Sequence, residues 1–229
     1  MMKKSFLLLL LAAAVGHMPA AWGQEKDWDS TFRPNNYALK VGQFKSYPNS
    51  TKDIIFLGNS ITAGTDWSEL LGMTHVRNRG ISGDITFGVL ERLEEVVEGK
   101  PAKVFVLIGI NDISRNIPDS LIICNYRSII HGIKKGSPKT KIYFHTLLPV
   151  NNEFIQFKNH YNKDEHILWV NEKLKKLARE ENITIIDLYP HFLNRDNKLD
   201  KKYTQDGLHL NAEGYKVWTS VLKKGNYLK

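Results

Sequence analysis

The sequence predicts an α/β fold, a three-layer domain built around a five-stranded parallel sheet. Short continuous apolar runs, of the kind found in strands buried on both faces, alternate along the chain with longer amphipathic segments of helical period. This alternation implies parallel strands joined by right-handed crossovers. In such folds the functional crevice lies beyond the carboxyl ends of the strands.

Residues 1–23 have the organisation of an export signal. Two lysines precede a short apolar run over 6–15, and Ala21-Trp22-Gly23 offers a cleavage site. The apolar run is too short to span a bilayer comfortably, so an uncleaved anchor is the less favoured alternative. We therefore expect an exported protein, periplasmic or secreted, without stable membrane insertion once the signal is removed.

The rest of the chain is expected to form one domain with an N-terminal extension. Removing 23 residues from the 229 leaves 206, enough for one well-buried domain. Residues 24–52 are assigned to an extension that packs on the domain, and 53–229 to the domain itself. Within the extension, Tyr37, Val41 and Phe44 recur at helical spacing, which favours a short helix.

Charge and cysteine content exclude some classes of function. The net charge of +8 is spread over lysine-rich segments with no dense basic patch interleaved with aromatic residues, so nucleic-acid binding is disfavoured. The lone Cys124 cannot form an internal disulfide, and its apolar helical context predicts a small core residue. No Cys/His cluster has the spacing of a zinc site.

The strands and helices of the domain follow in order. The apolar runs predicted as strands are 54–57, 75–79, 104–108, 142–146 and 183–187. The amphipathic segments predicted as helices run from Asp84 to a stop at Gly99, over 119–135, over 164–181, and onward from Asn211. Their apolar stripes are expected to form core.

Ser60 follows the first predicted strand, where Gly58 ends the apolar run and the chain turns toward a helix starting near Asp66. A serine on a tight strand-to-helix turn presents its hydroxyl beside backbone N–H groups, which suits a nucleophile. The alternative is a simple helix cap. A phosphate-binding P-loop is excluded because no lysine follows Gly64, and the spacing differs from the Gly-x-Ser-x-Gly elbow.

A base with its orienting carboxylate is predicted near the C-terminus. Asp206 and His209 stand three residues apart, so on a turn the carboxylate can hold one ring nitrogen while the other accepts the proton of Ser60. The alternative is a loop aspartate beside a surface histidine. Asp187, at the end of the fifth predicted strand, is a rival orienter.

Donors for an oxyanion are expected at the same edge of the sheet. The candidates are the N–H of Ser60, the N–H of Gly80 and the side-chain amide of Asn111. Taken singly, Gly80 reads equally as a turn glycine and Asn111 as an Asx turn. However, Ser60, Gly80, Asn111 and His209 each follow a different predicted strand. Their meeting in one crevice favours acyl transfer.

Four motifs together resemble the SGNH (GDSL) hydrolase family. They are Gly58-Asn59-Ser60-Ile61-Thr62, Asn78-Arg79-Gly80-Ile81-Ser82-Gly83-Asp84, Gly109-Ile110-Asn111-Asp112 and Asp206-Gly207-Leu208-His209. The resemblance covers about 53–224 and implies a flavodoxin-like α/β/α sandwich, a Ser60–His209–Asp206 triad, and no metal or other cofactor. Similarity to the platelet-activating-factor acetylhydrolase catalytic subunits, in the patterns over 78–93, 147–149 and 209–215, indicates a short acyl group such as acetyl.

One position departs from the family pattern. The residue before the nucleophile is usually aspartate in this family, and here it is Asn59. The change removes a charge beside Ser60 and keeps a side chain able to hold the turn, so we expect activity to survive.

The expected function is that of an exported serine esterase removing small acyl groups, acetyl above all, from a glycan or small-molecule ester. The polar-aromatic loop 150–163, including Phe154, and Asp66 and Trp67 are candidates for substrate binding. Their alternatives are a plain surface loop and a core tryptophan. Two other functions stay open: a lysophospholipase or thioesterase acting on lipid, and a catalytically silent glycan-binding protein. The sequence does not determine the oligomeric state.

Overall fold

The structure, a computed structural model, describes residues 28–229, and the predicted export signal lies outside this range. All five strands are parallel and follow the order β2-β1-β3-β4-β5. Their bounds are β1 Ile54–Gly58, β2 Val76–Gly80, β3 Lys103–Leu107, β4 Lys141–His145 and β5 Thr184–Ile186. The predicted fold class and all five strand positions are confirmed, with shifts of at most one residue at each end.

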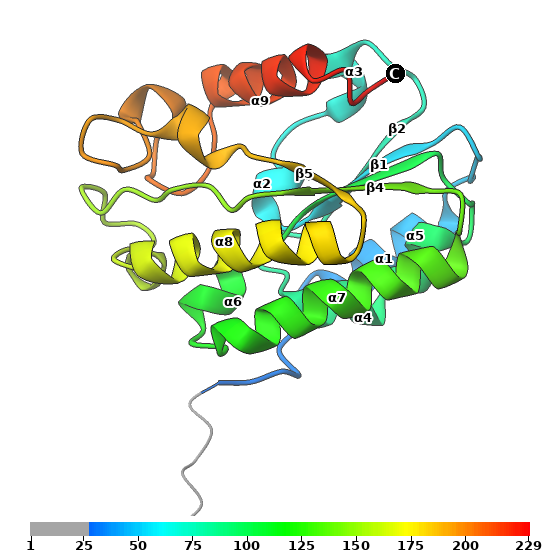
Figure 1. Cartoon of the computed structure of the whole chain (residues 1–229), viewed down its shortest axis with the longest axis horizontal. Helices are drawn as coiled ribbons and strands as arrows, with labels where there is room; N and C mark the ends of the chain where they lie inside the picture. The colour runs from blue at the N-terminus through cyan, green and yellow to red at the C-terminus, as the bar shows by residue number, and fades with distance from the viewer. Residues whose placement is uncertain (1–27) are drawn as a thin grey trace, which may run out of the picture.

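Helices cover both faces of this sheet. Helices α3 and α9 lie on one face, and α1, α4, α5, α7 and α8 lie on the other (Figure 1). The helices are α1 Tyr37–Ser46, α2 Ser60–Ala63, α3 Trp67–Leu71, α4 Thr86–Glu91, α5 Leu93–Val97, α6 Ile110–Ser114, α7 Asp119–Gly136, α8 Asp164–Glu180 and α9 Ala212–Lys224. Short 3-10 turns occur at Lys158–His160, Tyr189–Phe192 and Lys201–Tyr203.

Two sequence predictions need correction. The helix expected from Asp84 to Gly99 is divided into α4 and α5 at Arg92, whose φ of −101° and ψ of 14° depart from helical geometry. The break lets the Arg92 side chain turn inward, where it is fully buried. Cys124 is exposed on α7 and is not a core residue, because it lies beside the buried stripe formed by Ile122, Tyr126, Ile129 and Ile133.

An aromatic stack fills the layer under α3 and α9. Phe56, Phe105 and Tyr143 occupy matching positions of β1, β3 and β4, and their rings stack at centroid distances of 5.0 and 4.6 Å. Trp67 of α3 stacks on Phe56 at 4.0 Å, and Trp218 of α9 contacts the edge of Trp67. This aromatic packing stabilises the sheet, and the sheet in turn positions the strand ends that carry the site.

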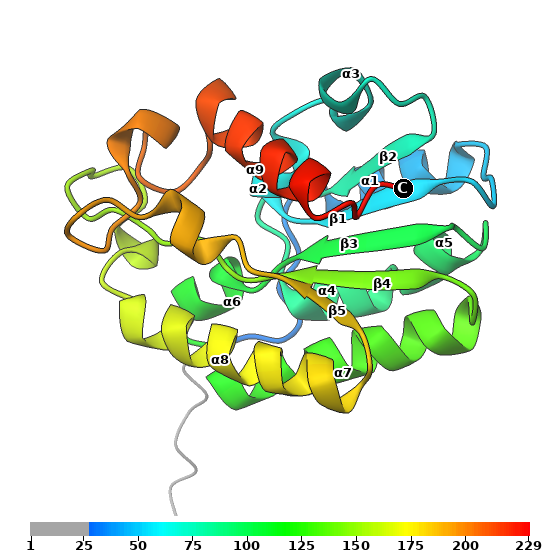
Figure 2. The same cartoon turned by 45° about the horizontal axis from the view of Figure 1, so that its top comes forward.

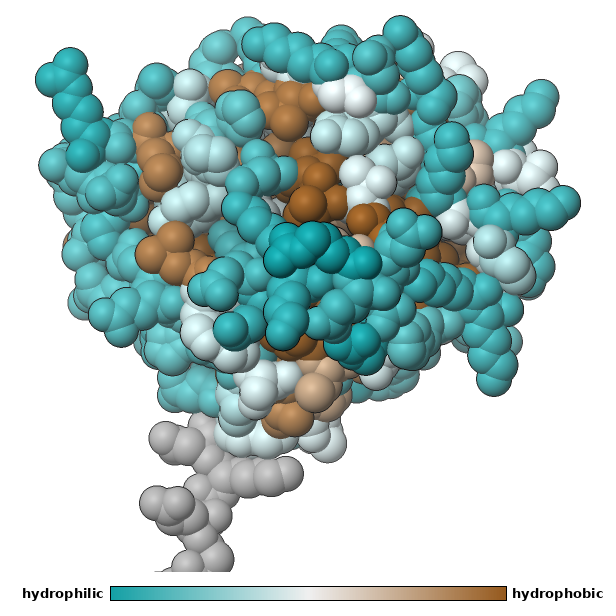
Figure 3. Space-filling view, in the orientation of Figure 1, coloured by the Kyte–Doolittle hydropathy of each residue, from teal (hydrophilic) through white to brown (hydrophobic). Residues whose placement is uncertain are grey.

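Residues 28–52 pack against the domain. Trp28 stacks on Phe87, the Tyr37 hydroxyl donates to the carbonyl of Gly88, and Phe44 lies under the guanidinium of Arg79. The face seen in Figure 3 is mostly hydrophilic, with hydrophobic areas separated by polar side chains. Across the described residues, no helix combines the length and apolar character needed to cross a membrane.

Candidate active site

The strands place the predicted residues at one edge of the sheet. The arrowheads of β3 and β4 point toward the side where α6 lies (Figure 2). Ser60 is the first residue of α2, immediately beyond β1, and the Asn59 side chain caps this helix by accepting from the N–H of Ile61 at 3.0 Å. Asn59 therefore holds the turn as expected from the sequence.

Ser60, His209 and Asp206 form one hydrogen-bonded chain. The Oγ of Ser60 lies 2.8 Å from Nε2 of His209, and Nδ1 of His209 lies 2.8 Å from Oδ2 of Asp206. The hydroxyl can donate to Nε2 only when the imidazole carries its proton on Nδ1, and the carboxylate accepts that proton. The arrangement can therefore activate the hydroxyl for nucleophilic attack.

The carboxylate of Asp206 is itself held in place. Its Oδ1 accepts from the backbone N–H groups of Leu208 and His209 at 2.9 and 2.8 Å. Burial raises the pKa of Asp206, but hydrogen bonds from His209 and Leu208 outweigh it and leave the pKa below the usual value. The rival orienter Asp187 is engaged elsewhere, by Thr146 at 3.0 Å and Lys175 at 2.5 Å.

Asn111, in α6 beyond β3, is fixed on both ends of its amide. Its Nδ2 donates to the carbonyl of Asp84 at 2.9 Å, and its Oδ1 accepts from Nε2 of His160 at 2.9 Å. One Nδ2 hydrogen stays available to the pocket. Burial, and then the charges of His209 and Arg115, lower the pKa of His160 to about 4, so this histidine is a neutral donor at neutral pH.

Gly80 does not supply an oxyanion donor, and this prediction was wrong. Its N–H donates to Oδ1 of Asn78 at 2.8 Å, so the hydrogen is already used. Gly80 is needed for close packing, because a Cβ there would collide with the backbone of Ala63 in α2.

Gly83, and not Gly80, has its backbone N–H at the pocket that contains Ser60. It lines the same pocket as Ser60, has a φ of +82°, and its N–H has no acceptor among residues 28–229. Sequence reasoning chose the first glycine of the Gly80–Gly83 loop. Gly83 lies beyond the end of the strand, where a glycine can adopt a positive φ and leave its N–H unpaired. Its position after the strand was the signal in the sequence that could have identified Gly83 as the donor.

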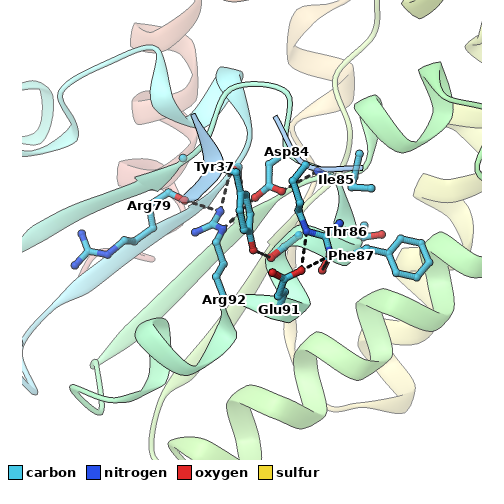
Figure 4. Close-up of polar contacts among 12 residues, drawn as sticks. Tyr37, Arg79, Asp84, Ile85, Thr86, Phe87, Glu91 and Arg92 are labelled. Atoms are coloured by element: carbon cyan, nitrogen blue, oxygen red, sulfur yellow. Dashed lines mark hydrogen bonds and ion pairs between the residues drawn. The ribbon is translucent and has the colours of Figure 1, made fainter. Parts of the chain in front are cut away.

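A buried charge cluster ties these strand ends together (Figure 4). Nε of Arg92 pairs with Asp84 at 3.0 Å, while its Nη2 donates to the carbonyls of Arg79 at 2.9 Å and Gly58 at 3.2 Å. The carboxyl ends of β1 and β2 are thereby linked to the loop that carries Gly83. The cluster is structural: its groups lie under the site and satisfy one another.

The fold brings a second carboxyl group beside Asn111. Asp112 is fully buried and accepts from both the N–H and the hydroxyl of Thr86, at 3.0 and 2.5 Å. Burial raises the pKa of Asp112 to about 7. These bonds fasten α6 to the start of α4 and so fix Asn111 relative to Gly83.

The pocket at Ser60 has a volume of about 440 Å³, and polar and apolar groups both contribute to its wall. It is lined by Ser60, Ser82, Gly83, Asn111, Ser114, Arg115, Phe157, Asn159, His160, Leu208 and His209. Phe157 contacts the face of the His209 ring at a centroid distance of 4.9 Å. Sequence reasoning did not select Arg115, and it treated Phe157 and His160 only as members of a polar-aromatic loop.

None of the three predicted substrate-binding residues lines this pocket. Trp67 is a core residue, 1% exposed and stacked on Phe56. Asp66 caps α3 by accepting from the N–H groups of Ser68 and Glu69. Phe154 packs beside Gly207 and precedes Phe157 by three residues in the loop. Packing or helix capping therefore accounts for each of these three side chains, and the sequence shows such roles only indirectly.

The apolar space next to the neighbours of Ser60, Asn59 and Ile61, is small. An apolar cavity of about 10 Å³ lies among residues that flank the catalytic motifs, including Ile61, Leu148 and Leu208. A channel for a long acyl chain is therefore missing on this side, within the part of the chain that the structure describes. In the same range, no group of three or more His, Cys, Asp or Glu side chains could hold a metal ion.

The chain matches one family model and is similar to several known proteins. The model of the GDSL-like lipase/acylhydrolase family matches residues 56–217. The chain is 29% identical over 169 residues to platelet-activating factor acetylhydrolase IB subunit alpha2 of Rattus norvegicus, covering 71% of each chain.

Two solved structures are similar in fold and sequence. A Streptococcus pneumonia protein named for platelet activating factor superposes with a TM-score of 0.77 and 29% identity, covering 85% of this chain and 93% of that one. The acetyl xylan esterase AlAXEase gives a TM-score of 0.63 and 25% identity, covering 76% and 98%.

Proposed function

Because this chain belongs to the GDSL-like lipase/acylhydrolase family, we propose that it is a serine esterase removing short acyl groups, acetyl above all, from carbohydrate esters. The observation that carries the proposal is the hydrogen-bonded chain from Ser60 through His209 to Asp206. No cofactor is required for this chemistry.

In the proposed mechanism Ser60 is the nucleophile. His209 Nε2 accepts the hydroxyl proton as Oγ attacks the ester carbonyl, and it returns that proton to the leaving alcohol. The acyl group is then bound to Ser60 Oγ. Water, deprotonated by the same nitrogen, attacks this acyl-enzyme and releases the acid. Asp206 stabilises the imidazolium formed in both steps.

The oxyanion is proposed to bind the N–H groups of Ser60 and Gly83 and the amide of Asn111. The two backbone donors have no acceptor among residues 28–229, and Asn111 retains one free hydrogen. All three residues line one pocket. Donors already fixed before the reaction stabilise developing charge without reorganisation.

The shape and polarity of the pocket support a short acyl group on a sugar. The small apolar cavity of about 10 Å³ favours acetyl over longer chains. The open pocket offers hydroxyl and amide groups from Ser82, Ser114 and Asn159 beside the Phe157 ring, a mixture suited to a sugar. The likeness to an acetyl xylan esterase points the same way.

Hydrolysis of p-nitrophenyl acetate, butyrate and octanoate by residues 24–229 tests the acyl-length part of this proposal. We expect kcat/KM to fall by about ten-fold or more from acetate to octanoate, because the apolar cavity of about 10 Å³ has no room for the added methylenes. A screen of acetylated sugars would follow.

Two outcomes contradict the proposal in different ways. A preference for octanoate favours a lipid esterase. Absence of both hydrolysis and labelling by a serine-reactive fluorophosphonate favours a binding protein on the same fold.

Replacing Asn111 with alanine removes one oxyanion donor, and kcat is expected to fall by about 10²–10³-fold. KM should change little if the donor acts mainly in the transition state. Steady-state kinetics on p-nitrophenyl acetate measure both. Asn171→Ala is the matched control, because Asn171 is also buried but its Nδ2 donates to the carbonyl of Leu147, outside the lining of the pocket at Ser60. Equal kcat values for the two variants would refute the assignment.

We also propose that the protein is exported, on the pattern of residues 1–23 alone. Acetylated glycans outside the cytoplasm would then be its substrates. The N-terminal residue of the protein recovered from the extracytoplasmic fraction, expected to be Gln24, checks this.

A further inference from the structure

Arg115 lies in the proposed active-site pocket, directly after the helix that carries Asn111. Its N–H donates to the carbonyl of Asp112 at 3.1 Å, so its backbone is fixed to the same turn. Its side chain lines the pocket together with Ser60 and His209. The positively charged guanidinium of Arg115 is therefore attached to the same turn as Asn111, the proposed oxyanion donor.

The guanidinium of Arg115 is seated on an aromatic ring from the N-terminal extension. Its Cζ lies 3.1 Å from the ring centroid of Phe32. Stacking on one face of the plane leaves the N–H donors at its edge free to point elsewhere. The contact orients the fork before any ligand arrives.

No side chain within 28–229 forms an ion pair or hydrogen bond with this guanidinium. The two nearest carboxylates have other partners: Asp29 accepts from Thr31, and Asp112 accepts from Thr86. Five other arginines of the same range are paired with carboxylates: Arg33, Arg77, Arg79, Arg92 and Arg127.

The pocket contains no carboxylate of its own. Apart from Arg115, its lining consists of hydroxyl, amide, imidazole, glycine and apolar groups. Among the lining residues, an anion would meet the planar donor fork of Arg115 and no carboxylate. Guanidinium matches carboxylate and phosphate oxygens with two parallel hydrogen bonds.

We propose that Arg115 binds an anionic group, a carboxylate or a phosphate, on the alcohol part of the ester, and that the preferred substrates are acylated acidic sugars. This proposal rests on the proposed esterase function of Ser60. It names the substrate class that this pocket recognises, and it makes Arg115 a specificity-determining residue.

The test uses three substrates that differ only at carbon 6. They are methyl 2,3,4-tri-O-acetyl-glucoside, the corresponding glucuronoside, and the 6-phosphate of the first. Acetate release gives kcat/KM for each. We expect the enzyme to favour at least one anionic substrate by about ten-fold or more over the neutral one. The glucuronoside arm identifies a sugar acid, and the phosphate arm identifies a phosphorylated sugar.

Arg115→Gln should abolish this preference by lowering kcat/KM on the anionic substrates, so the readout is the ratio of kcat/KM on the anionic sugars to kcat/KM on the neutral sugar. Arg115→Lys should keep part of the preference, because the charge stays and the fork is lost. Arg179→Gln is the control for net charge: Arg179 is exposed in the last turn of α8, outside the pocket lining. This variant should discriminate as the unmodified enzyme does.

The proposal is overturned if the unmodified enzyme does not discriminate, or if Arg115→Gln discriminates equally well. Failure of the underlying function looks different, since Ser60-dependent hydrolysis of p-nitrophenyl acetate would then be missing. That ester carries no anionic group, so its turnover tests Ser60 without the proposed anion contact to Arg115.

Discussion

Ser60→Ala is expected to eliminate ester hydrolysis, with a loss in kcat on the order of 10⁶-fold. The reason is that the attacking atom itself is removed, while His209 and Asp206 keep their mutual hydrogen bond at 2.8 Å. Steady-state assays on p-nitrophenyl acetate, together with labelling by a fluorophosphonate probe, measure the effect. The unmodified protein should be labelled and the variant should not.

The fold should survive this substitution, because the Ser60 side chain is half-buried and, within residues 28–229, its hydroxyl bonds only to the His209 ring. Circular dichroism and thermal unfolding check this. Ser128→Ala serves as the matched control, since its hydroxyl donates to a helix carbonyl on the exposed side of α7. Covalent labelling or turnover retained by Ser60→Ala would exclude Ser60 as the nucleophile.

Asp206→Asn is expected to lower kcat by about 10⁴-fold. The backbone N–H groups of Leu208 and His209 donate to Oδ1, so an asparagine would keep its carbonyl there and turn its NH₂ toward His209. The ring would then place its proton on Nε2. That nitrogen could no longer accept the proton of Ser60.

The rival position offers a control for this result. Asp187→Asn removes a partly exposed ion pair with Lys175, worth less than about 1 kcal/mol, and should leave kcat unchanged. The same p-nitrophenyl acetate assay compares the two. A larger loss in Asp187→Asn than in Asp206→Asn would mean that the orienting carboxylate had been misassigned.

Local sequence patterns predicted the fold and part of the site. Strands such as β3 are buried along their whole length and so read as unbroken apolar runs. The Asp206–His209 pair lies within one turn, so its short spacing already contained the geometry. Ser60 follows its strand directly. These features depend on neighbours in sequence, and a single chain displays them.

Contacts between segments that are distant in the chain could not be predicted from local sequence patterns. Gly80 and Gly83 are equivalent as letters, and only the bond from Gly80 to Asn78 and the packing of α2 distinguish them. Cys124 lies in an apolar stretch, yet its place beside the buried stripe of α7 leaves it exposed.

The sequence by itself determined the sheet, the order of the motifs and the positions of Ser60, Asp206 and His209 along them, because backbone periodicity and short-range turns set these features. Tertiary structure alone decided which donors face the pocket. Asn111 is held by His160 across 49 positions, and Phe32 of the N-terminal extension stacks on the guanidinium of Arg115. The physical reason is that hydrogen-bond saturation and stacking are settled by whichever groups the fold brings within contact distance.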